Sequence, residues 1–164
     1  MLENLSIKNF VIVDHLELNF ENGFSALTGE TGAGKSILID ALSLSLGQRG
    51  DSGVVRHNKD KSDISATFNI SKNASAQQWL KENELEDDEG NLFLRRVIYK
   101  DGKSKAFING IPVTINQLKS VGELLIDIYS QNSHHSLLKN STQREILDNF
   151  AELDQEVVEI RKLY

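Results

Sequence analysis

The sequence predicts an α/β fold in which helices pack against a sheet, and three observations lead to it. Several short runs carry apolar residues at every second position, as in 64–70, which is typical of half-buried strands. A glycine-rich loop at 29–36 lies between a strand-like run and a helix-like run. Near the carboxyl end, apolar residues recur at spacings of four and three. We therefore expect a layered α/β domain over residues 1–140 and the start of a coiled-coil helix over 141–164.

The first 28 residues are predicted to form strands. Residues 5–13 indicate a first strand and a turn, and 15–20 alternate apolar and polar side chains as a half-buried strand does. An Asn-Gly turn then leads into 23–28, a short run suited to a buried strand. A strand is therefore expected directly before the glycine-rich loop.

The loop itself spells GxxxxGKS, the phosphate-binding motif of P-loop nucleotide hydrolases. Its residues are Gly29, Glu30, Thr31, Gly32, Ala33, Gly34, Lys35 and Ser36. A polyphosphate is held by consecutive backbone N–H groups, and the chain curls tightly enough only where side chains are absent, which explains the glycines. Lys35 supplies a cation for the terminal phosphates, and the Ser36 hydroxyl suits a magnesium ion. A chance match is the alternative, and the strand and helix on either side of the loop argue against it.

Further helices and strands are predicted after the loop. The segment 37–46 is apolar nearly all round, so it should be a buried helix, and Gly47 should end it. A strand at 64–70 and a short helix at 75–83 follow. The runs 92–99 and 104–108 surround an Asp-Gly turn and precede an Asn-Gly turn, which predicts a meander.

The chain after this meander is predicted to contain a short helix ending near Val121 and a buried strand at 124–128. Thr142 and Glu145 then form a capping box, and a heptad pattern follows it at Ile146, Phe150, Leu153, Val157, Ile160 and Tyr164. No glycine or proline ends this segment, so we expect the helix to continue in a longer protein. An amphipathic helix that closes the domain is the alternative.

Composition limits the class of protein. A chain of 164 residues with 39% hydrophobic residues is long enough for one compact domain with a core. It contains no cysteine, which excludes disulfides, thiolate metal sites and thiol nucleophiles. No apolar run approaches the length of a membrane span. A cytoplasmic protein without a membrane partner is the simplest expectation.

The net charge argues against a protein that binds nucleic acid as a basic clamp formed by the whole chain. The formal net charge is -6, whereas nucleic-acid binding depends largely on neutralising phosphates. Two local basic groups remain, at 56–61 and 95–105. Solvated surface charge is the simpler interpretation of each.

The layout and wording of the sequence resemble a known family. An early phosphate loop, a sheet after it and an outgoing helix are the layout of SMC-like ATPase heads. Residues 5–13, the loop in its GETGAGKS form with 37–42, and 107–110 resemble the amino-terminal part of the bacterial RecN family. Glu30-Thr31 stands where other SMC-like proteins usually carry a different pair, such as Pro-Asn, so the loop favours RecN.

This resemblance implies an ABC-type ATPase head with ATP and Mg²⁺ as cofactors. The head would be completed by a carboxyl-terminal half and would pair with a second head of a homodimer. Its role would be recombinational repair of DNA double-strand breaks, with DNA bound by the assembled protein at the bacterial nucleoid. These properties are expectations from the family and do not follow from residue spacing.

The resemblance also assigns residues to the site. Residues 29–36 match the Walker A loop, and Gln131 matches the Q-loop glutamine, which with Ser36 would ligate magnesium. The flanks of Gln131 depart from the family, because this chain has Tyr129-Ser130 and Asn132 where RecN proteins typically have His-Gly and His. Arg56 lies at a distance past Lys35 where SMC-like heads often place an arginine near nucleotide or DNA.

Two catalytic motifs of such heads are missing from the sequence. It has neither an LSGG-type signature nor an apolar strand that ends in Asp-Glu, so no general base is evident. We expect this segment to bind ATP only weakly and hydrolysis to need the carboxyl-terminal half and a second head. Two other classes stay open: a P-loop ATPase complete in one chain, which would need a Walker B carboxylate, and a nucleotide-gated dimerisation module that does not depend on hydrolysis.

Overall fold

The computed structural model describes residues 1–28, 34–87, 90–126 and 128, together with residues 143, 144, 147, 148, 150, 151, 153, 157 and 160. The chain divides into two units, Met1–Ile126 and Asp127–Tyr164.

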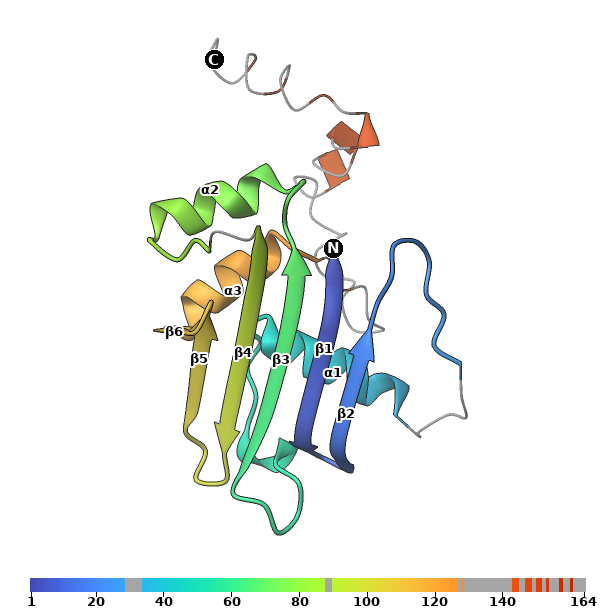
Figure 1. The fold of residues 1–164 in the computed structure, drawn as a ribbon, viewed down its shortest axis with the longest axis vertical. Coiled ribbons are helices and arrows are strands. Elements are labelled where there is room, and N and C mark those ends of the chain that lie inside the picture. The colour runs from blue at the N-terminus through green and yellow to red at the C-terminus, as the bar shows by residue number, and fades with distance from the viewer. Residues whose placement is uncertain are drawn as a thin grey trace. The chain divides into compact units, whose positions relative to one another are not determined.

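Six strands of the first unit form one sheet (Figure 1). They are β1 (Leu2–Phe10), β2 (Val13–Asn19), β3 (Lys61–Asn69), β4 (Asn91–Tyr99), β5 (Ser104–Ile108) and β6 (Ile111–Val113). Their order across the sheet is β2-β1-β3-β4-β5-β6, and every neighbouring pair is antiparallel. The strands predicted at 15–20, 64–70, 92–99 and 104–108 are therefore present.

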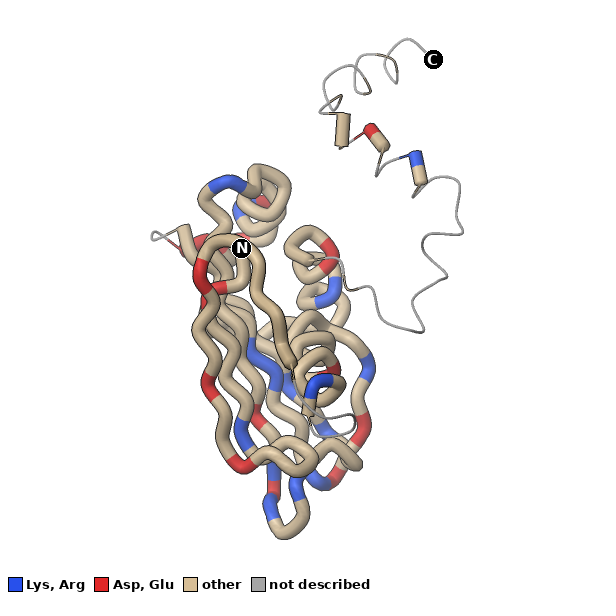
Figure 2. The backbone as a smooth tube through the Cα atoms, turned by 90° about the vertical axis from the view of Figure 1, so that its right-hand side faces the viewer, with Lys and Arg blue, Asp and Glu red and all other residues tan. Residues whose placement is uncertain are grey.

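Three α-helices and a short 3-10 helix accompany the sheet. They are α1 (Lys35–Ser45), α2 (Ala74–Glu82), α3 (Ile115–Glu123) and η1 (Ser52–Val54). Helix α1 contacts β1, β3 and β4, and α3 contacts β5 and α2. Figure 2 shows the sheet in profile with α1 and α3 on one side of it. That side is the core face.

The core forms where alternating apolar residues of neighbouring strands meet on this face. Leu5 pairs with Ala66 and Ile7 pairs with Ile64, and the accessibility of all four side chains is 2% or less. On β4 and β5 the same face carries Leu92, Leu94, Ile98, Ala106 and Ile108, which are also buried. Because side chains alternate between the two faces of a strand, the residues between these positions lie on the opposite face.

Two glycines allow α1 and α3 to approach closely. A Cβ on Gly47 would lie 2.5 Å from the Lys119 backbone nitrogen, and one on Gly122 would lie 2.7 Å from the Leu46 carbonyl oxygen. Gly47 also has a φ of 88°, which side chains disfavour. Gly47 ends α1 as predicted, and the contact holds the carboxyl end of α1 against α3.

Two predicted strands are absent. Residues 23–28 form no strand, and Phe24 and Leu27 are 95% and 54% exposed. An extended segment becomes a strand only when a neighbour accepts and donates its hydrogen bonds, and no described strand pairs with this one.

The second missing strand is the one predicted at 124–128. The amides of Leu124 and Leu125 donate to the carbonyls of Val121 and Gly122, so this apolar run continues the last turn of α3. The predicted burial is wrong as well, because Leu124 is 37% exposed and Leu125 and Ile126 are half-buried. The backbone hydrogen bonds of 124–126 belong to a helix end.

Helix α1 is buried along only half of its length, which corrects the prediction of a fully buried helix. Its second half contains Ala41 and Leu44, which are buried, whereas Ile39 in the first half is 43% exposed. The second half lies over the sheet and against α3, and the described residues offer no comparable cover for the first half.

The described residues of the second unit are mainly helical, at 143, 144, 147, 148, 150, 157 and 160. Within the predicted heptad pattern, Phe150, Leu153 and Ile160 are exposed. Ile146, Tyr164 and the capping-box residues Thr142 and Glu145 lie outside the described residues. The coiled coil and the domain boundary at 140 stay predictions.

Candidate nucleotide-binding site

The end of the phosphate loop forms the start of α1. Gly29, Glu30, Thr31, Gly32 and Ala33 lie outside the described residues. Gly34 is the N-cap of α1, with a φ of 138° that residues with a side chain rarely adopt. Lys35 and Ser36 are the first two residues of the helix, and both are exposed. The strand expected before the loop is not formed, but the helix after it begins where the motif requires.

The amino-terminal end of α1 is suited to an anion. The first backbone N–H groups of a helix have no acceptor within the helix. In α1 the N-cap residue makes no side-chain cap, and the first turn contains no acidic residue. The partial positive charge of the helix end is therefore not offset within this turn. Combined with Lys35 and the Ser36 hydroxyl, this end provides the donors, the cation and the metal-binding oxygen that a phosphate–magnesium group requires.

Gln131, the expected second magnesium ligand, lies outside the described residues. A buried strand at 124–128 was expected to carry it, but residues 124–126 form a helix end instead. Its place beside Ser36 stays a prediction.

Arg56 lies beside the turn that joins β1 and β2. Its Nη1 donates to the carbonyl oxygen of Ile12, and its backbone amide donates to the carbonyl oxygen of Asn9 over 2.9 Å. Its Nε lies 3.8 Å from Asp14 Oδ1. In this structure Arg56 thus braces the β1–β2 turn, and a contact with nucleotide or DNA stays a prediction.

The turn braced by Arg56 contains a strained residue that was not singled out from the sequence. Val11 has a φ of 49°, in the left-handed region that β-branched residues avoid. Its amide donates to the Val54 carbonyl over 2.8 Å. No pattern in the sequence signals this, because valine is typical of strands.

The burial of Arg96 also differs from the prediction. The sequence groups it with the surface cations of 95–105, but it is only 3% exposed and faces the core. Its Nε and Nη1 are buried without a hydrogen-bond partner among the described residues. Burial lowers the pKa of its guanidinium. The sequence could have indicated this burial. Arg96 stands at the same alternate positions of the strand as Leu92, Leu94 and Ile98, which places all four side chains on one face.

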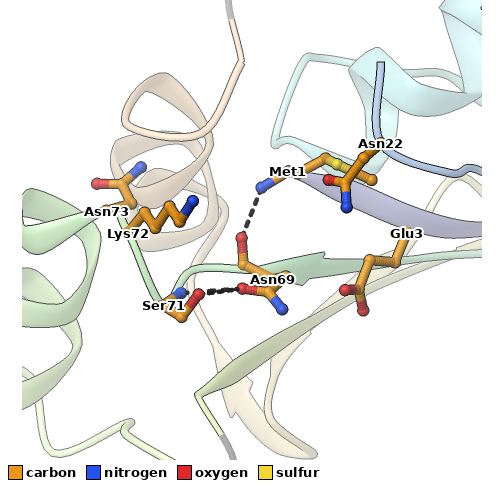
Figure 3. A pocket seen from close by; sticks show the side chains of 7 residues that line it. All are labelled: Met1, Glu3, Asn22, Asn69, Ser71, Lys72 and Asn73. Carbon is orange, nitrogen blue, oxygen red and sulfur yellow. Dashed lines mark hydrogen bonds between the residues drawn. The ribbon is translucent and has the colours of Figure 1, made fainter.

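A separate cavity of about 360 Å³ lies where β1 begins and β3 ends (Figure 3). Two hydrogen bonds join polar groups that line it: the Met1 amino group donates to the Asn69 carbonyl, and the Ser71 hydroxyl donates to Asn69 Oδ1 over 2.6 Å. The predicted site residues that the structure describes, Gly34, Lys35, Ser36 and Arg56, do not line it.

The described part of the chain offers neither a metal-ion cluster nor a membrane-spanning helix. It contains no group of three or more His, Cys, Asp or Glu residues that could hold a metal ion. No helix in the same ranges is long and apolar enough to cross a membrane.

Comparison with known proteins identifies the family. The model of the AAA domain matches residues 4–164. The DNA repair protein RecN of Vibrio cholerae is 50% identical over 151 residues, which are 92% of this chain and 27% of that protein. RecN of Haemophilus influenzae is 45% identical over 166 residues, which cover all of this chain and 30% of that protein. The chain thus spans less than a third of the length of these relatives.

Solved structures share its fold. The Smc head domain of Pyrococcus yayanosii matches with a TM-score of 0.69 at 19% identity, over 98% of this chain and 34% of that one. The recombination mediator RecF with ATP matches with a TM-score of 0.56 at 18% identity, over 91% of this chain and 37% of that one. The predicted SMC-like head fold is confirmed. The chain belongs to the AAA domain family, and within it the predicted resemblance to the RecN DNA repair proteins is confirmed along nearly its whole length.

Proposed function

We propose that this chain is the ATP-binding half of an SMC-like ATPase that acts in recombinational repair of DNA double-strand breaks. The observation that carries the proposal is the uncapped start of α1 with Gly34, Lys35 and Ser36, in a chain 50% identical to a RecN repair protein. The ATPase activity and the repair role belong to the longer protein.

ATP and Mg²⁺ are the proposed cofactors. Residues 29–34 would hold the phosphates through backbone N–H groups, and Lys35 would contact the terminal phosphates. The Ser36 hydroxyl and the Gln131 amide oxygen would ligate the magnesium ion. Arg56 would contribute to the nucleotide or DNA only if it exchanges its present contacts with Ile12 and Asp14 for that ligand.

Hydrolysis is proposed to need the carboxyl-terminal half of the protein. The sequence lacks a Walker B carboxylate, and phosphoryl transfer depends on positioned charges that a half site does not supply. The exposed run 23–28 and the exposed first half of α1 support this, since both lie beside the phosphate loop and present apolar side chains that another segment would cover.

A second head would complete the active site across a homodimer, and the assembled protein would bind DNA. The acidic balance of this chain makes it a poor sole site for duplex DNA. The protein would act in the bacterial cytoplasm at the nucleoid.

ATP binding and hydrolysis by the full-length protein test the proposal. Lys35→Ala should abolish ATP hydrolysis and repair, because the terminal phosphates lose their cation. Lys119→Ala is the matched control, since Lys119 is an exposed lysine on α3, and it should leave both unchanged. Normal hydrolysis by the Lys35→Ala protein would refute the site.

The isolated 164-residue chain separates the half-site proposal from its rivals. It should bind ATP with Mg²⁺ weakly and show no turnover. Lys35-dependent turnover by this chain would favour an ATPase complete in one chain. Full repair by a longer protein that cannot hydrolyse ATP would favour a nucleotide-gated dimerisation module.

A further inference from the structure

The face of the sheet opposite α1 and α3 is covered by no described helix (Figures 1 and 2). Its central residues, Asp63, Ser65 and Thr67 on β3, are half-buried, whereas their neighbours on the core face are fully buried. An antiparallel sheet commonly leaves one face to solvent, and that face is then polar. This one is not uniformly polar.

Three aromatic rings lie on this open face, on two adjacent strands. Phe93 and Tyr99 belong to β4, and Phe107 on β5 pairs directly with Arg95. Phe93 is 38% exposed, and the other two rings are half-buried. Aromatic rings at these positions are available to a flat partner that lies against the sheet.

Cations lie among the rings. Arg95 is held by Asp63 through two hydrogen bonds, Nε to Oδ1 over 2.8 Å and Nη2 to Oδ2 over 2.6 Å. The guanidinium carbon lies 5.7 Å from the centre of the Phe107 ring. Lys105 Nζ lies 5.8 Å from the centre of the Tyr99 ring. Each cation is therefore placed against a ring, as in cation–π pairs.

The space between these two pairs is filled. Val97 lies on the open face between Arg95 and Tyr99, and it is only 3% exposed. Lys105 pairs with Val97 across the β4–β5 ladder. The rings and cations thus form a continuous platform over β4 and β5, which we call the basic-aromatic platform: Phe93, Arg95, Val97, Tyr99, Lys105 and Phe107.

Charge on this face differs from that of the whole chain. Lys8 and Lys61 on the neighbouring strands share the open face with Arg95 and Lys105, and the acidic residues at the paired positions of this face are Asp63 and Glu17. The chain as a whole has a net charge of -6. The open face therefore favours an anion even though the protein as a whole does not.

We propose that the basic-aromatic platform binds single-stranded DNA. Bases stack on exposed aromatic rings and on guanidinium planes, while lysines contact the phosphates. A duplex presents phosphates but keeps its bases stacked inside, so it would not use the rings. DNA is favoured over RNA because the similar proteins are DNA repair proteins. The proposal rests on the DNA-repair role proposed above, but not on the nucleotide site.

Fluorescence anisotropy with the full-length protein tests this, using a labelled thymidine oligonucleotide of about 16 nucleotides, near the upper site size of such platforms. Phe93→Ala should weaken binding by about tenfold or more, the loss expected for one stacked base. Lys105→Gln should weaken binding. It should also reduce the slope of log affinity against log salt concentration by about 1, the change expected for the loss of one phosphate contact. Lys119→Gln on α3 is the matched control and should have no effect.

Two further measurements separate this inference from the proposed function. Lys35→Ala should abolish ATP binding yet retain the oligonucleotide in the absence of nucleotide, and Phe93→Ala should retain ATP hydrolysis measured without DNA. The inference is overturned if Phe93→Ala and Lys105→Gln bind as tightly as Lys119→Gln. It is also overturned if these changes weaken duplex and single strand equally, or if a uridine oligoribonucleotide of the same length binds more tightly than DNA.

Discussion

Arg96 shows how a single residue can work against the stability of a fold. Its guanidinium lies on the core face at 3% exposure, and two of its nitrogens lack partners among the described residues. A buried charge that is not paired costs several kcal/mol. Burial lowers the folded-state pKa of this arginine below its unfolded value, so the cost is fully present at any pH below the folded-state pKa and is relieved as the pH rises above it.

Replacing Arg96 by methionine should therefore stabilise the protein. Methionine is flexible and fills a similar volume, and replacing buried ionic groups by apolar ones often gains about 1–4 kcal/mol. Urea unfolding of the two proteins gives the difference. Arg95→Met is the control, since Arg95 is paired with Asp63 and partly exposed, and it should not gain stability. A lower unfolding midpoint for Arg96→Met would show that Arg96 has a partner in solution.

Val11 is strained for a different reason, its backbone conformation. The β1–β2 turn gives it a φ of 49°, which crowds a β-branched side chain. Val11→Asn should stabilise the protein by about 1 kcal/mol, because asparagine tolerates the left-handed region. Thermal unfolding measures the gain. Ile12→Asn is the control: Ile12 is exposed and not in the left-handed region, so the same new residue there should bring no gain. Equal effects at the two positions would rule out backbone strain as the cause.

At the scale of elements, the close approach of α3 to the carboxyl end of α1 anchors the helix that follows the phosphate loop. The second half of α1 packs on the sheet, and its carboxyl end meets α3 through Gly47 and Gly122. The exposed first half, which carries Lys35 and Ser36, extends from this anchor. The geometry of the candidate site therefore depends on a glycine contact about a helix length away.

Gly122→Ala should disturb this contact. The added Cβ would lie 2.7 Å from the Leu46 carbonyl oxygen, so α3 and α1 must move apart, at a cost of about 1–3 kcal/mol. Ser120→Ala, at an exposed position of the same helix, should change stability by less than about 0.5 kcal/mol. Urea unfolding compares the two variants, and ATP binding by the full-length Gly122→Ala protein should weaken as well. Equal stability of both variants would show that the contact is loose in solution.

At the scale of the whole molecule, we expect the run 23–28 to pair with a segment of the longer protein. It has the composition of a buried strand, yet Phe24 is 95% exposed and no described strand pairs with the run. A strand composition without a partner is explained if the partner lies in the longer protein.

Hydrogen exchange can detect that partner. The amides of 24–28 should exchange slowly in the full-length protein, where a neighbouring strand would accept their hydrogen bonds, and rapidly in the isolated 164-residue chain. Amides of β3, which are paired within the first unit, serve as the internal reference and should be protected in both. Rapid exchange of 24–28 in the full-length protein would contradict the pairing.

Much of the fold could be predicted because local patterns and tertiary contacts agree there. Ile64, Ala66 and Phe68 alternate in sequence and are buried together on β3. The motif residues Lys35 and Ser36 begin a helix as the loop chemistry requires. The predictions failed where a contact from elsewhere was needed. No described strand pairs with 23–28, and the amides of 124–126 donate to carbonyls at the end of α3.

By itself, the sequence determined the phosphate loop, the alternation of the strands and the resemblance to RecN, because these depend on residue type and spacing along the chain. The alternation along β4 already separates Arg95 from Arg96, but only the tertiary structure decided that the face of Arg96 is the buried one. Arg95 and Arg96 are neighbours in sequence, but the pleat of β4 sends one to the open face beside Phe107 and buries the other. Which of those faces meets solvent depends on the face against which α1 and α3 pack. The contacts of these helices with the strands join residues that are distant in the chain.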